Sequence, residues 1–143
     1  MKKIVIDFEE FRALCGAILD EVAGGGRTYR SVLCPLKGGF YLSHFMSRRL
    51  GIPMEYIVIS SYVRVDQKEF SVHDVPELSG GRYLLCDDVF DSGRTVEKIR
   101  SLYPHVTFDV ACLLAKSEGA AGYFGRRIPS DAIRNFSGQR TFQ

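Results

Sequence analysis

Continuous apolar runs alternate along the chain with segments in which apolar residues recur every three or four positions. The periodic segments predict three helices, and each is followed by glycine or proline, residues that end helices. The continuous runs are short and rich in β-branched residues, which predicts buried strands. The predicted helices are 8–23, 40–50 and 95–103, and the predicted strands are 31–34, 55–62, 82–86 and 106–114.

This order of elements predicts an α/β fold, a parallel sheet flanked by helices on both faces. The length of 143 residues suits a single domain, 1–143. In such sheets ligands bind beyond the carboxyl ends of the strands. Three polar segments, 35–39, 87–95 and 115–119, follow predicted strands and are expected to meet there, whereas the polar segment 63–78 is predicted to be a loop.

The composition and net charge limit the possible partners and the cellular compartment, but they say little about the reaction. The net charge of +2 and the scattered basic residues argue against a nucleic-acid partner. No apolar run is long enough to span a membrane, and the N-terminus has no signal-peptide pattern, so we expect a cytoplasmic protein. The four cysteines form no CxxC pair and are expected to be buried thiols, and the three histidines fit no metal-ligand spacing.

The segment "LLCDDVFDSGRT", residues 84–95, carries the densest chemistry in the chain. Asp91, Ser92, Gly93, Arg94 and Thr95 lie where a strand gives way to a helix, and free backbone N–H groups at a helix start bind anions. Hydroxyls and one guanidinium add donors to this turn. The segment predicts a phosphate site, and the alternative is an ordinary turn in which Asp91 or Ser92 caps the helix.

Asp87 and Asp88 are adjacent carboxylates at the end of a buried strand. Like charges in such a place repel each other and are costly to bury. Sugar hydroxyls or a divalent cation would stabilise them, since carboxylates accept hydrogen bonds from diols and Mg²⁺ prefers oxygen ligands. The alternative is a solvated acidic loop. With the neighbouring phosphate site, the pair predicts a ribose 5-phosphate ligand.

The same segment resembles the signature of type I phosphoribosyltransferases, and most of the chain resembles the bacterial xanthine-guanine and hypoxanthine-guanine group. The resemblance implies a fold with a small C-terminal hood and a mobile flap, and a homo-oligomer (dimer or tetramer). It implies transfer of 5-phosphoribosyl from 5-phosphoribosyl-1-pyrophosphate (PRPP) to a 6-oxopurine, with Mg²⁺ as cofactor. In this scheme Asp87 and Asp88 bind the ribose and the metal, residues 91–95 bind the 5-phosphate, and Asp91 is the acid/base at the purine N7.

Two further segments resemble substrate-binding parts of that family. "CPLKGG" resembles the pyrophosphate loop, formed by Leu36, Lys37, Gly38 and Gly39, and the alternative is a plain glycine turn. "ISSY" resembles the opening of the flap, with Ser60, Ser61 and Tyr62, and the alternative is a plain β-hairpin.

The base site matches the family less well. Lys116 follows the last long strand, where the family has a lysine that reaches the purine 6-oxo group. Near "IP" the family has an aromatic residue that stacks on the base, whereas this chain offers Ala132 or Ile133, with Arg134 next to them. Two alternatives therefore stay open: a PRPP-binding regulatory protein without transferase activity, and a phosphoribosyltransferase for a different base.

Overall fold

The structure is a computed structural model that describes residues 3–36, 38–64, 67–91, 93–116, 122–129 and 133–136. These residues form three helices and eight strands. The helices are α1 (Phe8–Gly24), α2 (Phe40–Leu50) and α3 (Arg94–Leu102). The strands are β1 (Lys3–Ile6), β2 (Val32–Leu36), β3 (Met54–Arg64), β4 (Gln67–Asp74), β5 (Gly81–Phe90), β6 (Val106–Ala115), β7 (Tyr123–Arg127) and β8 (Ile133–Phe136).

The main sheet has the strand order β4-β3-β2-β5-β6-β7. All neighbouring strands in it are parallel except β3 and β4, which pair antiparallel. Beside this sheet, β1 and β8 form a separate parallel pair, with Ile4 opposite Arg134. The prediction of a parallel sheet flanked by helices is confirmed. The β1–β8 pair is the part of the structure that corresponds to the small hood, and we use that name for it.

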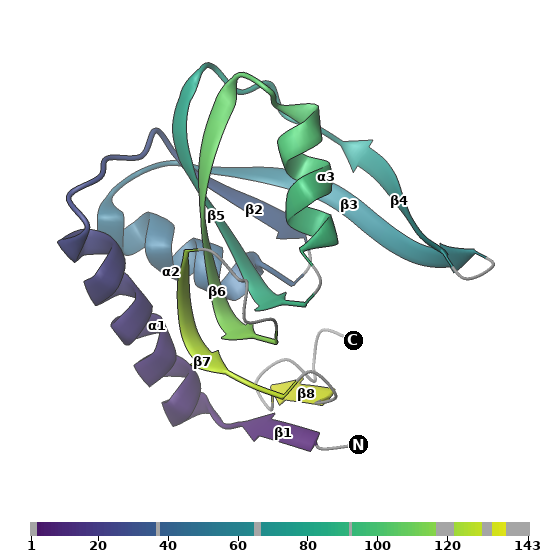
Figure 1. Ribbon diagram of the computed structural model, residues 1–143. Helices are drawn as coiled ribbons and strands as arrows, with labels where there is room; N and C mark the ends of the chain where they lie inside the picture. The colour runs from purple at the N-terminus through teal and green to yellow at the C-terminus, as the bar shows by residue number, and fades with distance from the viewer. Residues whose placement is uncertain are drawn as a thin grey trace.

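The helices cover both faces of the sheet, as Figure 1 shows: α1 and α2 lie on one face and α3 on the other. The alternation of side chains along a strand explains the two cores, because Leu84 packs with α1 and α2 while Leu85 packs with α3. Both residues are fully buried, as are Met46 in α2 and Ile99 in α3. This central position of β5 fixes where its carboxyl end lies.

Local interactions and backbone geometry define the helix ends. Asp7 accepts a 2.8 Å hydrogen bond from the backbone N–H of Glu10 and so caps α1. Gly51 ends α2 in the left-handed region, with φ of 69°, a conformation that glycine adopts without strain. The four cysteines are free and buried, as expected.

Two details of the prediction are wrong. Most of segment 63–78 is strand and not loop, because β3 continues to Arg64 and β4 (Gln67–Asp74) returns antiparallel at the edge of the sheet, where polar side chains are tolerated. β5 runs to Phe90, so Asp87 and Asp88 lie within the strand. No helix among the described residues is long and apolar enough to cross a membrane.

Candidate active site

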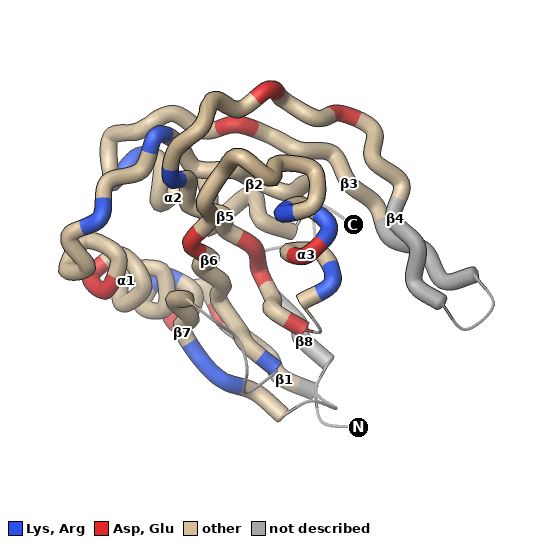
Figure 2. The backbone as a smooth tube through the Cα atoms, turned by 45° about the horizontal axis from the view of Figure 1, so that its top comes forward, with Lys and Arg blue, Asp and Glu red and all other residues tan. Residues whose placement is uncertain are grey.

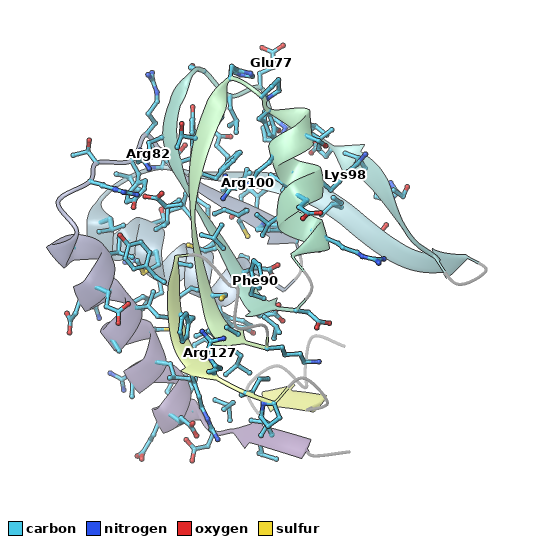
Figure 3. All side chains as sticks on the ribbon, viewed as in Figure 1. Glu77, Arg82, Phe90, Lys98, Arg100 and Arg127 are labelled. Carbon is cyan, nitrogen blue, oxygen red and sulfur yellow. The ribbon has the colours of Figure 1, made fainter. Side chains whose placement is uncertain are left out.

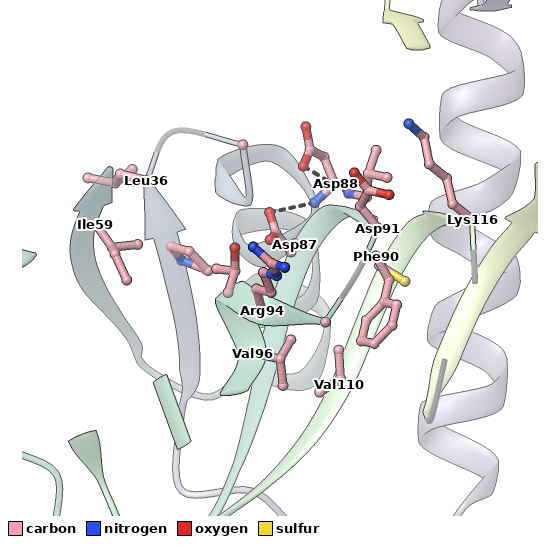
Figure 4. Close-up of a pocket in the computed structure, with 16 residues that line it drawn as sticks. Leu36, Ile59, Asp87, Asp88, Phe90, Asp91, Arg94, Val96, Val110 and Lys116 are labelled. Atoms are coloured by element: carbon pink, nitrogen blue, oxygen red, sulfur yellow. Dashed lines mark hydrogen bonds between the residues drawn. The ribbon is translucent and has the colours of Figure 1, made fainter. Parts of the chain in front are cut away.

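A cavity of about 320 Å³ opens at the carboxyl ends of the central strands. The three polar segments expected to meet there do line it, so their predicted convergence is confirmed. Figure 4 shows the labelled side chains around this space. Its lining consists of residues 35, 36, 38, 87–91, 93–96 and 116, together with Ile59, Val110 and Cys112.

Asp87 and Asp88 form the acidic side of the cavity. Asp88 is 6% exposed, whereas Asp87 is partly exposed. One oxygen of Asp87 accepts the backbone N–H of Asp88 at 2.8 Å, and one oxygen of Asp88 accepts that of Val89 at 2.8 Å. These bonds fix both carboxylates against their own strand end, in an orientation suited to hydroxyl donors or a cation.

The glycines after β2 allow the chain to pass directly beneath these acids. A Cβ at Gly38 would lie 2.7 Å from Oδ1 and 2.9 Å from Cγ of Asp88. A Cβ at Gly39 would collide with the carbonyl oxygen of Cys86, which already accepts a 3.1 Å hydrogen bond from the Ser43 hydroxyl. Glycine is therefore required at both positions for steric reasons, and the 36–39 turn is locked to the end of β5.

The start of α3 forms the side of the cavity that suits an anion. Gly93 is the N-cap residue, with φ of 83°, and it has no side chain to accept from the first N–H groups of the helix. Arg94 and Thr95 follow at the first two helical positions and line the cavity. Figure 2 shows the acidic end of β5 beside the basic residues of α3. The helix dipole favours negative charge at this end.

Asp91 and Lys116 lie on the remaining side, near the hood. Asp91 is exposed and lines the cavity together with Asp88; both are labelled in Figure 4. The backbone N–H of Lys116 donates a 2.8 Å hydrogen bond to the carbonyl of Phe90, which holds the end of β6 to the end of β5. A carboxylate and an ammonium group at one end of a cavity can recognise both a proton and a carbonyl of a heterocycle.

Several predicted residues are not placed in the cavity. Lys37, Ser92 and Ala132 lie outside the described residues. Ile133 and Arg134 begin β8, whose backbone pairs with β1. Ser60, Ser61 and Tyr62 lie on β3 in the β3–β4 hairpin, and the Ser60 hydroxyl is 3.0 Å from Nε2 of His73 on β4. The position of this hairpin agrees with the expected flap, and its mobility stays a prediction.

The apolar residues that line the cavity were not predicted from the sequence. Ile59 on β3, Phe90 on β5, and Val110 and Cys112 on β6 come from three separate strands and are brought together by strand pairing. Burial raises the pKa of the Cys112 thiol to about 12, so this cysteine is a neutral lining residue and not a nucleophile. An aromatic residue between two acids, as in "DDVFD", was the available signal for Phe90.

The donor set fits a magnesium ion bound together with its substrate. Among the described residues no group of three or more His, Cys, Asp or Glu side chains is arranged to hold a metal. Mg²⁺ does not need such a group, because it keeps several waters and is held in many enzymes by one or two carboxylates plus substrate oxygens. Asp88 and Asp87 supply those carboxylates at the cavity wall.

Comparison with known proteins agrees with this site. The sequence profile described as "Phosphoribosyl transferase domain" matches residues 7–121. The chain therefore belongs to the phosphoribosyl transferase domain family, and its class is that of the phosphoribosyltransferase enzymes. The match includes the 36–39 turn, the 87–95 segment and Lys116, while β1, β7 and β8 lie outside it.

Individual relatives point in the same direction. A xanthine-guanine phosphoribosyltransferase from Vibrio parahaemolyticus is 29% identical over 119 residues, which are 82% of this chain and 75% of that protein. One from Vibrio vulnificus is 30% identical over 118 residues, with the same coverage. The solved structure of the xanthine-guanine-hypoxanthine phosphoribosyltransferase from Helicobacter pylori shares the fold, with a TM-score of 0.81, 20% identity and coverage of 98% of this chain and 96% of that one.

Proposed function

We propose that this protein transfers the 5-phosphoribosyl group of PRPP to a 6-oxopurine, giving a nucleoside 5′-monophosphate and pyrophosphate. One observation carries the proposal: a single cavity joins an acidic pair, a helix start suited to phosphate, a glycine turn and a lysine. These four features match the ribose, the 5-phosphate, the pyrophosphate and the base. The Vibrio relatives, named for xanthine and guanine, support the choice of a purine.

PRPP binds in this proposal along the edge of the sheet. The 5-phosphate lies at the start of α3, where it accepts backbone N–H groups and contacts Ser92 and Thr95. The ribose hydroxyls donate to Asp87 and Asp88. The pyrophosphate lies over residues 36–39, where Leu36 and Gly38 line the cavity and Gly38 has no side chain to cover the backbone. Anchoring of the remote phosphate orients the reacting carbon.

Mg²⁺ is the proposed cofactor, held by Asp88 and Asp87 with oxygens of the substrate. When bound, it supplies positive charge that stabilises the leaving pyrophosphate. The protein contributes the remaining charge through Lys37 and the backbone N–H groups beside it. As the pyrophosphate departs, positive charge develops on the ribose ring, and the β3–β4 hairpin is proposed to close as a flap that excludes water.

The base enters from the side of the hood. Asp91, which lines the cavity, accepts or donates the proton at purine N7. The Lys116 ammonium donates to the 6-oxo group and repels a 6-amino group, which selects against adenine. Ile133 and Arg134 on β8 complete the base site, and an aliphatic residue then covers the ring in place of an aromatic one.

The proposal also includes the metabolic role, the cellular compartment and the oligomeric state. The substrates are nucleotide precursors, so we expect the protein to act in purine salvage in the cytoplasm. We also expect a homo-oligomer, which agrees with large hydrophobic side chains that are exposed in the single chain, among them Phe8, Phe40 and Tyr56.

Release of pyrophosphate from PRPP and Mg²⁺ across a panel of bases tests the proposal. We expect release with guanine, xanthine or hypoxanthine, and little with adenine or orotate. Binding of PRPP without release on any base would replace the proposal with a PRPP-binding regulatory protein. Release with a pyrimidine alone would identify a transferase for a different base.

A further inference from the structure

Phe90 lies between the part of the cavity proposed to bind the 5-phosphate, at Gly93, and the part proposed to bind the base, at Lys116. It is the last residue of β5, and it lines the cavity between the acids Asp88 and Asp91. Figure 3 shows it at the far end of β5 from Arg82. Nothing in the chemistry of the reaction requires an aromatic ring at this place, so its contacts have to explain it.

The ring of Phe90 supports the turn at the start of α3. Its side chain packs on the core between α3 and the sheet, and in Figure 4 it points away from Asp91 towards Val110. A Cβ built on Gly93 would lie 3.1 Å from Cζ of Phe90 and 3.6 Å from Cε1. The tip of the ring therefore lies directly against Gly93, whose φ of 83° gives the turn its shape.

The backbone of Phe90 supports the other end of the site. Its carbonyl accepts the 2.8 Å hydrogen bond from the backbone N–H of Lys116, and Phe90 pairs with Ala115 in the β5–β6 ladder. Phe90 is therefore bonded through its backbone to the strand end that carries Lys116, while its ring lies against the turn that precedes α3.

We propose that Phe90 is a positioning residue that holds the Gly93 turn in the conformation that binds the 5-phosphate. This role rests on the proposed function, because it assumes PRPP as the ligand. The ring of Phe90 sets the position of the turn. A smaller residue would leave Gly93 without a packing partner, and a longer one would displace Gly93 into the phosphate site. Loss of support lowers affinity because the backbone donors must then be ordered when the ligand binds.

Substitution at Phe90 separates this role from general packing. Phe90→Tyr adds an oxygen at Cζ, the atom that faces Gly93, and we expect it to raise the KM for PRPP roughly tenfold while kcat at saturating PRPP changes little. Phe90→Leu is expected to raise the same KM. Phe108→Leu is the matched control, because Phe108 is 3% exposed in the same core cluster but does not line the cavity. It should lower thermal stability and leave the KM for PRPP unchanged.

A double-mutant cycle with Gly93 tests the contact itself. Gly93→Ala introduces the Cβ that meets the ring, so it should weaken PRPP binding, and Phe90→Leu should restore part of that loss by making room. We expect the double variant to bind PRPP several-fold more tightly than the product of the two single effects predicts. Equal KM values for wild type, Phe90→Tyr and Phe90→Leu, or simple additivity in the cycle, would overturn the role of Phe90. Failure of the wild type to bind PRPP would overturn the proposed function as well.

Discussion

Gly38 lies against the carboxylate of Asp88 so closely that a methyl group at residue 38 would be 2.7 Å from Oδ1. This contact joins the turn after β2 to the end of β5. In the proposed function it also joins the pyrophosphate site to the acid that binds ribose and metal. The spacing of the two sites therefore depends on the absence of a side chain at residue 38.

Replacement of this glycine should damage substrate binding. Gly38→Ala must displace the buried carboxylate of Asp88 or the turn itself, and we expect PRPP affinity to fall by about tenfold or more. Isothermal titration calorimetry with PRPP and Mg²⁺ measures the loss. Gly16→Ala is the control, because in the described part of the chain no atom outside the adjacent residues and the backbone of α1 lies within 4 Å of the added methyl group. That control should bind PRPP normally and be more stable by about 0.5–1 kcal/mol.

The second prediction concerns Asp91. If it exchanges the proton of the purine N7, Asp91→Asn should lower kcat by about a hundredfold or more, since the amide cannot accept that proton. The KM for PRPP should change little. Steady-state kinetics with guanine and varied PRPP separates the two constants. A kcat close to that of the wild type would exclude the acid/base role.

Lys116 should control the choice between oxo and amino purines. Lys116→Met removes the ammonium group, so the preference for hypoxanthine over adenine, measured as the ratio of kcat/KM values, is expected to fall by about tenfold. Lys98→Met is a suitable control, because Lys98 lies on α3 and does not line the cavity (Figure 3). An unchanged ratio in Lys116→Met would move base selection to other residues.

A fourth prediction concerns stability at the opposite end of the sheet. Asp109 on β6 accepts hydrogen bonds from Arg27 at 2.9 Å, Arg82 at 2.8 Å and the Tyr29 hydroxyl at 2.6 Å. Burial alone would raise the pKa of Asp109, but the hydrogen bonds from Tyr29 and Arg27 and the charges of both arginines outweigh it and lower that pKa.

A lowered carboxyl pKa stabilises the folded state above the pKa of the unfolded chain, and this contribution is lost as the pH falls through the folded value. At pH 7 we expect Asp109→Asn to lower the free energy of unfolding by about 1–3 kcal/mol. The difference from the wild type should shrink below about pH 4, where the carboxyl of the unfolded chain begins to protonate while that of the folded protein is still charged. Urea unfolding across pH measures it. A difference that stays constant down to pH 2.5 would contradict this cause.

Local chemistry predicted much of the fold and the site. Residues 40–50 were predicted as a helix because the glycines and the proline around it are strong stop signals, and α2 has these bounds. The acidic pair and the turn at Gly93 were predicted from the chemistry of segment 84–95, and Lys116 from the resemblance to the family. That these segments meet was predicted because the carboxyl ends of parallel strands lie at one edge.

Other features depend on contacts that are distant in sequence. The pairing of β1 with β8 joins the two ends of the chain, and neither strand carries a local pattern that requires the other. The β4 edge strand is rich in polar residues because an edge strand is only partly covered, with Val72 packed against the core, and so its sequence predicted a loop. The contact of Phe90 with Gly93 follows from the packing of α3, which the order of residues does not reveal.

Formation of a nucleoside 5′-monophosphate from PRPP, Mg²⁺ and hypoxanthine tests the central claim most directly. Mass spectrometry of the reaction should show inosine 5′-monophosphate accumulating in step with pyrophosphate, and a parallel reaction with adenine should give little product. Tight binding of PRPP with no nucleotide formed from hypoxanthine, guanine or xanthine would contradict the account.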